Sequence, residues 1–430
     1  MTYNRTMKTI FTHHPILSVF VLAPLFASAQ DEHFIYGKIT LVDNKVYEGP
    51  IRWGKEEVYW NDLFNAEKVD NTNLRYLTSD ERRDLDDRQF YHHHDGSGWG
   101  RWADSFGWRW DDNDHGRDRD YVHQFACQFG EIKTLTPQGS KWVDIELQNG
   151  MKLELSGDGY NDVGLDIRVI DADLGEVEIY WNRIEKIEFK NTPSKLANRF
   201  GKPLYGTVES FGTKFTGFIQ WDHDERLSVD KLDGDSDDGD LSIEFDKITS
   251  ITRVGSRCKV VLKSGRELFL EGSNDVNREN RGVIVMNRDI PALDIPWSEF
   301  DKITFEEKPP MAMSSYDQFK NQKELSATVK TFGGESYSGR LVFDLDEEFD
   351  FELLQGKDHD FEYTTAFRNV KKIKTYDDTR CEIELKSGQK LKLHDAQDVD
   401  ERNQGLLLFA SGKDKPTYIP WEKVSEIEFR

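Results

Sequence analysis

Cysteine is scarce in this sequence, with three residues among 430. A secreted domain held together by disulfides needs a dense and usually even set of cysteines, so no disulfide framework is predicted. Cys258 and Cys381 each lie four residues before a strand leucine, and Val143 occupies the same place in a related segment. A position filled by cysteine or valine on one strand face predicts a small buried apolar side chain.

Long apolar runs and positive charge are also in short supply. After the first thirty residues, no stretch approaches the ~18 consecutive apolar residues of a membrane-spanning helix. Lys and Arg number 57 against 80 Asp and Glu, which gives a net charge of −23. Nucleic acids and anionic membranes bind cationic surfaces, so the composition argues against both as partners.

The motifs of common enzyme mechanisms are missing as well. The sequence has no Ser/His/Asp order, no reactive cysteine motif and no glycine-rich phosphate loop. Aromatic residues make up 12% of the chain, including 11 Trp, so the chain has enough apolar area for folded cores despite its acidity. We expect a folded protein that is not an enzyme, and calcium is the only cofactor that any motif suggests.

The first 29 residues have the pattern of a secretory signal peptide. Arg5 and Lys8 give a positive start, an apolar core follows over residues 16–27, and the small tripeptide Ala-Ser-Ala ends at position 29. The sequence therefore predicts a signal peptide over 1–29. The mature protein is expected to be exported, periplasmic or extracellular, and not to span the membrane.

Internal repetition is the clearest feature of the sequence. Segments 259–305 and 382–429 match almost throughout, and segment 144–189 is a third copy. A second, different repeat precedes each of them and begins at Tyr36, Tyr205 or Ser326. Every copy opens with an alternating strand, a turn containing Gly or Asn, and another alternating strand, which is the pattern of a β-hairpin. The sequence therefore predicts six units arranged as three pairs.

Each of the six units ends with an apolar residue at every third position. Period three is too tight for an amphipathic α-helix and wrong for a strand, but it fits one turn of 3₁₀ helix that leads into a last strand. The closing residues are Phe129, Ile132, Leu135, Trp181, Ile184, Ile187, Phe245, Ile248, Ile251, Trp297, Phe300, Ile303, Phe367, Val370, Ile373, Trp421, Val424 and Ile427.

The units resemble SH3-like and Sm-like small β-barrels, in architecture alone. This resemblance implies an all-β chain of six tandem barrels in three pairs, in which each strand presents one face to a core and the other to water. Polar linkers that contain proline separate the pairs. The predicted domains are a first pair over 30–190 with an insertion at 66–123, a second pair over 203–307 and a third pair over 324–430.

The insertion at 66–123 breaks the repeat, and its centre is rich in aromatic residues. Trp99, Trp102, Trp108 and Trp110 lie there among Arg and Asp. This composition is typical of carbohydrate-binding surfaces, in which flat rings stack on sugars and short polar groups bind hydroxyls. A loop in solvent, or one packed against a neighbouring unit or a partner protein, is the simpler interpretation. The four tryptophans are the candidate ligand-binding residues.

One acidic turn resembles a calcium-binding loop. Asp233, Asp235, Asp237 and Glu244 fall at positions one, three, five and twelve of the EF-hand pattern. Position six is Asp238, where the pattern needs Gly, and strands are expected on both sides in place of helices. The spacing makes these four acids candidate calcium ligands, whereas the composition favours a solvated turn.

Two further acidic motifs recur. Trp-Asp-His-Asp-Glu at 221–225 matches Phe-Asp-Leu-Asp-Glu at 343–347, and Asn-Asp-Val at 161–163 and 274–276 matches Gln-Asp-Val at 397–399. Paired carboxylates can act as general acid and base, but Asp after a strand usually fixes a turn. We interpret both motifs as turn-fixing. The second interpretation is a ligand groove, built from Asp275, Asn277, Asn280 and Arg281.

These observations predict an exported, non-enzymatic repeat protein. It would act as a binding or structural array at the cell envelope, with an envelope protein or a glycan as its partner. The alternative is an extracytoplasmic glycan-binding or glycan-hydrolysing protein that uses the tryptophan-rich insertion.

Overall fold

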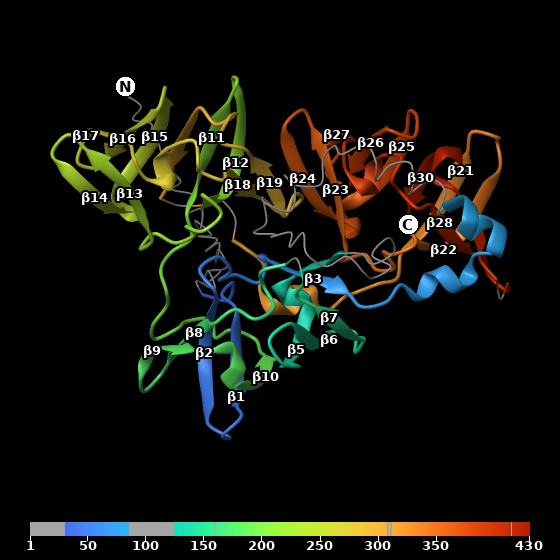
Figure 1. Ribbon diagram of the computed structural model, residues 1–430, viewed down its shortest axis with the longest axis horizontal. Coiled ribbons are helices and arrows are strands. Elements are labelled where there is room, and N and C mark those ends of the chain that lie inside the picture. Colours follow the sequence, from blue (N-terminus) through green and yellow to red (C-terminus); the bar gives the residue numbers. More distant parts are fainter. Residues whose placement is uncertain (1–30, 86–123, 159, 308, 310–311, 414) are drawn as a thin grey trace, which may run out of the picture.

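The computed structural model describes residues 31–85, 124–158, 160–307, 309, 312–413 and 415–430. The predicted signal peptide and the four insertion tryptophans lie outside these ranges. Within them the chain is nearly all β, with thirty strands in antiparallel sheets, which confirms the predicted class. None of the described helices has the length and apolar character needed to cross a membrane. Figure 1 shows the strands gathered in three groups.

The first group holds ten strands. They are β1 (Tyr36–Leu41), β2 (Val46–Trp53), β3 (Leu63–Lys68), β4 (Gln124–Gln128), β5 (Ile132–Pro137), β6 (Trp142–Leu147), β7 (Lys152–Ser156), β8 (Ile167–Asp171), β9 (Gly175–Ile179) and β10 (Ile184–Phe189).

The second group holds the next ten. They are β11 (Tyr205–Ser210), β12 (Thr213–Trp221), β13 (Lys231–Ser236), β14 (Gly239–Glu244), β15 (Ile248–Val254), β16 (Arg257–Leu262), β17 (Glu267–Leu270), β18 (Val283–Met286), β19 (Ala292–Ile295) and β20 (Lys302–Phe305).

The third group completes the chain. Its strands are β21 (Ser326–Thr331), β22 (Ser336–Val342), β23 (Leu353–Asp358), β24 (Phe361–Ala366), β25 (Val370–Thr375), β26 (Arg380–Leu385), β27 (Lys390–His394), β28 (Leu406–Phe409), β29 (Thr417–Ile419) and β30 (Val424–Phe429).

The three groups share one strand order, which is the structural counterpart of the sequence repeat. The first group forms a sheet in the order β4-β3-β7-β6-β5-β10-β1-β2-β8-β9. The pairings of the third group give the corresponding order β24-β23-β27-β26-β25-β30-β21-β22-β28-β29. The second group repeats this order, except that β13–β14 forms its own two-stranded sheet and meets the end of β17 through the bridge between Asp235 and Glu271.

The two units of each group exchange hairpins. In the first group β2, from the first unit, pairs with β8 of the second unit, and β3 of the hairpin β3–β4 pairs with β7. Among the described strands of this group, no pairing joins the terminal strands β4 and β9. The sheets are therefore open, and the predicted closed barrels are wrong. An alternating pattern fixes which face of a strand is buried, but it does not choose the neighbouring strand.

The period-three closures are confirmed. All eighteen closing residues are buried. A 3₁₀ turn precedes the last strand of five units, and a hydrogen-bonded turn from Trp297 to Phe300 takes its place in the sixth. Val143, Cys258 and Cys381 are buried as predicted, and the cysteines are free thiols. The five turns are η3 (Phe129–Glu131), η4 (Trp181–Arg183), η5 (Phe245–Lys247), η8 (Phe367–Asn369) and η10 (Trp421–Lys423).

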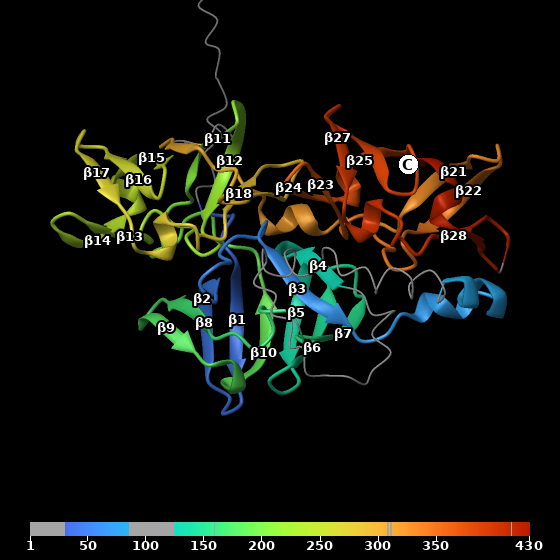
Figure 2. The same cartoon turned by 45° about the horizontal axis from the view of Figure 1, so that its top comes forward.

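The second and third groups lie side by side, and the first group lies across their junction (Figure 2). Strand β19 pairs with β24, so the second and third groups share one sheet and one apolar core. The connection between them packs against the core of the first group through η7 (Tyr316–Phe319). There Tyr316 stacks on Trp60 with ring centroids 4.4 Å apart.

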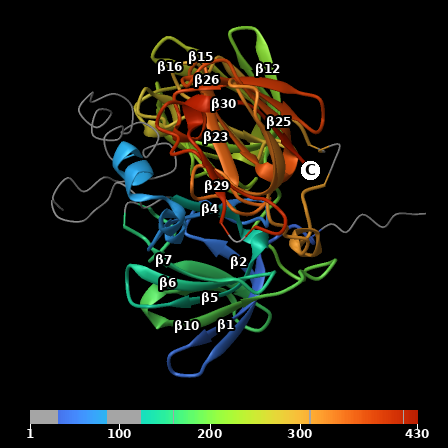
Figure 3. The same ribbon diagram turned by 90° about the vertical axis from the view of Figure 1, so that its right-hand side faces the viewer.

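The start of the insertion packs against the third group. The chain leaves β3 into η1 (Thr72–Tyr76), and residues 79–85 are helical. Leu74 and Leu85 form an apolar cluster with residues of the third group, among them Val342 and Leu407. Figure 3 shows this segment beside the third group. The described start of the insertion therefore ties the first group to the third.

A glycine in the second strand of each group passes very close to another backbone. A Cβ built on Gly217 would lie 2.3 Å from a carbonyl oxygen of β18, and Gly49 and Gly339 face carbonyl oxygens at 2.1 Å. We expect Gly217→Ala to lower the free energy of unfolding by about 1–3 kcal/mol, because the added methyl group forces the strands apart. Urea denaturation followed by tryptophan fluorescence measures this loss.

Gly206→Ala is the matched control for this prediction. A Cβ built on Gly206 would lie 2.5 Å from a carbonyl oxygen of β20, but the third group carries Ala327 at the equivalent position, opposite the last strand. The fold therefore accommodates alanine there, whereas all three groups keep glycine at the position of Gly217, so the loss should be smaller. Equal losses for the two variants would contradict a special requirement for glycine in the second strand.

Candidate functional site

A tight acidic turn follows the second strand of each group. It covers residues 53–57, 221–225 and 343–347, and in each copy the first and last residues pair as a β-bridge. Asp222 and Asp344 adopt positive φ angles of 47° and 49°, and Gly54 has the same conformation in the first copy. Asp tolerates the left-handed region better than most residues, which explains why it recurs at this position.

The first aspartate of the turn joins the two units of its group. Asp222 accepts hydrogen bonds from the backbone N–H of Arg281, at 2.6 Å, and from the side chain of Asn274, at 2.5 Å. Asp344 makes the equivalent pair of bonds with Gln404 and Gln397. These partners belong to the loop of the second unit. The motif therefore fixes structure as predicted, although across units and not within its own turn.

A further carboxylate follows each acidic turn and meets a cation from another group. Asp62, Asp230 and Glu352 are the equivalent residues, and each accepts hydrogen bonds from the backbone N–H groups of the two residues that come directly after the acidic turn. Asp62 pairs with Arg226 of the second group. The other two cations come from the first group, because Arg52 pairs with Asp230 at 2.7 Å and Lys68 with Glu352 at 2.8 Å. Ion pairs at equivalent positions thus connect the three groups.

The aspartate of the recurrent Asn-Asp-Val or Gln-Asp-Val motif is buried in all three groups. Asp162, Asp275 and Asp398 each accept a hydrogen bond of 2.6 or 2.7 Å from a backbone N–H in the third strand of their group. This contact holds the exchanged hairpin in place. The turn-fixing interpretation of this motif is therefore supported by the contacts.

In the second group these loops bring three carboxylates together. Oxygen atoms of Asp222, Glu225 and Asp275 all lie within 4.8 Å of one another. Asp222 and Asp275 are buried, with exposed fractions of 1% and 5%. Glu225 Oε2 is shielded from solvent and has no hydrogen-bond partner among the described residues. We call Asp222, Glu225 and Asp275 the carboxylate cluster.

The carboxylate cluster resists ionisation. Burial raises the pKa of Glu225 to about 9, and repulsion by Asp275 and Asp224 adds to this shift. Burial also raises the pKa of Asp275 to about 6, although the N–H of Asp233 opposes it. Removal from water disfavours the charged form, and neighbouring like charges do the same. Without a cation, the cluster therefore holds protons at neutral pH.

Arg281 lies between the carboxylate cluster and the first group. Its guanidinium contacts Asp224 at 2.6 Å, Asp222 at 3.7 Å and Glu56 at 3.8 Å. Glu56 belongs to the equivalent turn of the first group, and burial raises its pKa to about 8, with Asp162 and Asp224 adding to the effect. The acidic turns of the first two groups therefore face each other across Arg281.

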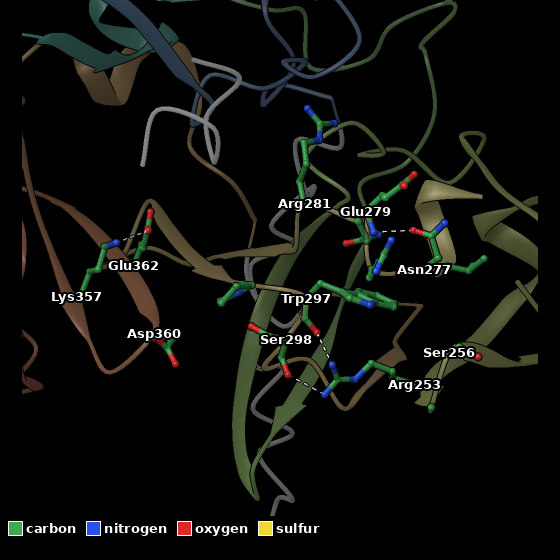
Figure 4. Close-up of a pocket in the computed structure, with 15 residues that line it drawn as sticks. Arg253, Ser256, Asn277, Glu279, Arg281, Trp297, Ser298, Lys357, Asp360 and Glu362 are labelled. Atoms are coloured by element: carbon green, nitrogen blue, oxygen red, sulfur yellow. Dashed lines mark hydrogen bonds and ion pairs between the residues drawn. The ribbon is translucent and has the colours of Figure 1, made fainter. Parts of the chain in front are cut away.

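A groove opens on the other side of the loop that follows Asp275. Its volume is 960 Å³, and it lies between the second group and the turn of the β23–β24 hairpin (Figure 4). Arg253 forms one wall, where it donates hydrogen bonds to the backbone oxygens of Trp297, at 2.9 Å, and Ser298, at 2.8 Å. Lys357 and Glu362 form an ion pair of 3.0 Å on the opposite wall.

The charges around the groove differ from those of the whole chain. Three arginines and one lysine line it, against three acids, although the chain carries a net charge of −23. Trp297 has an exposed fraction of 8% and stacks on Phe300, so its ring belongs to the core. The charged residues are Arg253, Arg278, Arg281, Lys357, Glu279, Asp360 and Glu362.

The predicted calcium ligands do not form a binding loop. Asp233 and Asp235 lie in β13 and Glu244 ends β14, so the chain between them is an antiparallel hairpin. Asp233 lies opposite Ser242, and Glu244 lies opposite Lys231. In an EF-hand, one loop wraps its ligands around the ion, whereas a hairpin spreads them along its length. The structure therefore does not bring these acids together around one point.

The predicted groove is present in part. Asn277, Asn280 and Arg281 line it, whereas Asp275 belongs to the carboxylate cluster on the other side of the loop. Glu225 was not among the predicted site residues. Its signal in the sequence was the repeated Asp-x-x-Glu of the turn, but its proximity to Asp275 depends on hairpin exchange.

Comparison of the chain with protein-family models, with curated proteins and with solved structures found no match.

Proposed function

We propose that this chain is an exported, non-enzymatic array at the cell envelope that binds a segment of a partner protein in the groove between its second and third groups. Export rests on the signal-peptide pattern over 1–29, which favours a periplasmic or extracellular location. The six units are proposed as tandem copies of an SH3-like or Sm-like ancestor whose hairpins were exchanged. The groove is the observation that carries the binding proposal.

The chemistry of the groove favours a polypeptide. Positive and negative side chains both line it, and Asn277, Ser256 and Ser298 add neutral polar groups. A peptide offers charges of both signs and backbone donors and acceptors, which such a lining can pair. A sugar needs an exposed aromatic face for stacking, and Trp297 is buried. The glycan alternative therefore depends on the insertion tryptophans.

The carboxylates of the second group favour a scaffold role over catalysis. An oxygen of Asp222 and an oxygen of Asp275 accept structural hydrogen bonds from backbone N–H groups. A general acid or base must exchange protons with a substrate, which such bonds restrict. This is the argument for a non-enzymatic protein.

Affinity capture from an envelope extract tests the proposal. The purified chain is immobilised, and bound proteins are identified by mass spectrometry after cross-linking. Arg278→Glu should reduce capture of the partner by about tenfold, because it reverses one exposed charge in the groove. Arg266→Glu makes the same charge change on the exposed β16–β17 turn, and it should leave capture unchanged.

Two outcomes would contradict this proposal. One is a partner retained equally by the wild type and by Arg278→Glu. The other is retention of the chain on insoluble polysaccharide with no protein partner, which would favour the glycan-binding alternative.

A further inference from the structure

The carboxylate cluster has the composition of a cation site. We propose that Asp222, Glu225 and Asp275 bind one divalent hard cation per chain, with Ca²⁺ as its representative. The cluster lies in the second group, and the β13–β14 hairpin with its predicted calcium ligands is a separate structure. The proposal does not depend on what binds in the groove.

The oxygen atoms are arranged as ligands of one ion. Three carboxylates, each offering an oxygen, meet within 4.8 Å. Backbone and side-chain donors fix Asp222, and a backbone N–H holds one oxygen of Asp275, so two of the three ligands are positioned before an ion arrives. Because the set contains only oxygen, it suits calcium or magnesium better than zinc or copper.

An unpartnered oxygen recurs on the same glutamate in all three groups. Oε2 of Glu57, Glu225 and Glu347 is buried, and within the described ranges none of the three has a hydrogen-bond partner. Glu57 and Glu347 are more than nine-tenths buried, with exposed fractions of 8% and 9%. A buried carboxylate oxygen without a donor is costly unless a proton or a cation compensates it.

The three copies differ in the groups around this oxygen. In the third group Lys68 lies among the acids, with Nζ 2.8 Å from both Asp346 and Glu352, and its charge opposes the burial and carboxylate repulsion that raise the pKa of Glu347 well above its usual range. In the first group Gly54 replaces the first aspartate, so one ligand is missing. In the second group Arg281 forms ion pairs with Glu56, Asp224 and one member of the cluster, Asp222. Among the described residues, the second group is therefore the one in which this glutamate meets two further carboxylates, and its Oε2 has no hydrogen-bond partner there.

The pKa shifts agree with this assignment. The raised pKa of Glu225, about 9, and that of Asp275, about 6, reflect burial of like charges in one place. A divalent ion would displace these protons and allow all three groups to ionise.

A bound ion would stabilise the wall of the groove. The cluster joins the turn at 222–225 to Asp275, and the loop from Asp275 reaches Asn280 and Arg281, which line the groove. Asn280 already donates a hydrogen bond of 3.0 Å to the backbone oxygen of Asp275. A calcium ion bound by Asp275 would add a second contact that holds this loop in place.

Isothermal titration calorimetry of the full chain tests the proposal after treatment with a chelator. Titration with CaCl₂ should show one site per chain with a dissociation constant below about 1 mM. Glu225→Gln keeps the size of the side chain and removes one ligand charge, so it should weaken binding by about tenfold or more. Glu347→Gln, at the equivalent position of the third group, should leave the affinity unchanged, as should Asp237→Asn in the hairpin turn.

A second measurement applies even if a variant folds poorly. Trp221 donates a hydrogen bond to the backbone oxygen of Asp275, at 3.0 Å, so its indole lies beside the site. Terbium bound to the wild-type chain should therefore emit on tryptophan excitation, and calcium should quench that emission by competition.

Four results would overturn the proposal. The first is a wild-type chain that takes up no calcium at millimolar concentration, and the second is a Glu225→Gln chain that binds calcium as tightly as the wild type. Loss of binding in Asp237→Asn with retention in Glu225→Gln would move the ion to the β13–β14 hairpin. Tighter binding of zinc than of calcium at a site sensitive to Glu225→Gln would reject the hard-cation class.

Discussion

The free energy of unfolding should fall by at least about 5 kcal/mol between about pH 6.5 and pH 8.5 when a chelator removes divalent cations. In the folded chain burial raises the pKa of Glu225 to about 9, of Glu56 to about 8 and of Asp162 to about 7. In the unfolded chain these carboxylates are ionised throughout this window, because their ordinary pKa values lie near 4. The folded state therefore holds protons that the unfolded state has released.

The sign of the effect follows from this difference. A carboxylate with a raised folded-state pKa contributes its full stability below the unfolded pKa, and that contribution is lost as the pH rises through the folded pKa. Each such proton costs about 1.4 kcal/mol per pH unit in this window. His33, whose pKa burial lowers to about 4, acts in the opposite direction only below its ordinary value of 6.5. The window therefore begins above that value.

Urea denaturation at several pH values measures this slope. Glu225→Gln should make the slope shallower, because one titrating group is removed from the cluster. Glu146→Gln is the control: this carboxyl lies at the surface, and a hydrogen bond from Lys133 lowers its pKa, so the slope above pH 6.5 should not change. A free energy of unfolding that stays constant or rises over the window would contradict the prediction.

The parts of the fold that the sequence predicted are those set by local pattern. Period three in the closures identified eighteen buried residues and most of the 3₁₀ turns, because both depend on neighbours three positions apart. The burial of Val143, Cys258 and Cys381 was predicted because the three residues occupy the same position on one face of equivalent strands. The hairpin exchange was not predicted, because the pairing of β2 with β8 joins segments more than a hundred residues apart and any alternating strand could take that place.

The site was predicted in the same uneven way. The recurrent aspartates, such as Asp275, were identified as structural because they repeat, and their backbone hydrogen bonds agree. The cations were not identified, because Arg226 and Lys68 break the repeat: Arg226 stands where the other groups have Val58 and Glu348. A residue that occurs once and acts on another group leaves no periodic signal. Contacts between groups therefore lay beyond what repetition could predict.

Replacing Arg226 by leucine should lower the free energy of unfolding by about 3–5 kcal/mol. Arg226 has an exposed fraction of 1%, pairs with Asp62 of the first group, and lies over the ring of Tyr59 at 5.2 Å. Leucine fills part of the volume but leaves Asp62 as a buried anion. In this variant Asp62 still accepts hydrogen bonds from the backbone N–H groups of Val58 and Tyr59, at 2.7 and 2.8 Å. These two bonds compensate only part of its charge.

Two further variants separate loss of the ion pair from loss of packing. Arg183→Leu removes an arginine whose ion pair with Asp43 is exposed to solvent, so it should cost less than about 1 kcal/mol. Arg226→Leu combined with Asp62→Asn should recover part of the loss, because the buried charge disappears together with its partner. Equal denaturation midpoints for Arg226→Leu and Arg183→Leu would show that the first two groups do not depend on this pair. A large loss in Arg226→Leu that the double variant reverses would support the opposite conclusion. Ion pairs between a buried carboxylate of one group and a cation of another would then be the contacts that join the three groups.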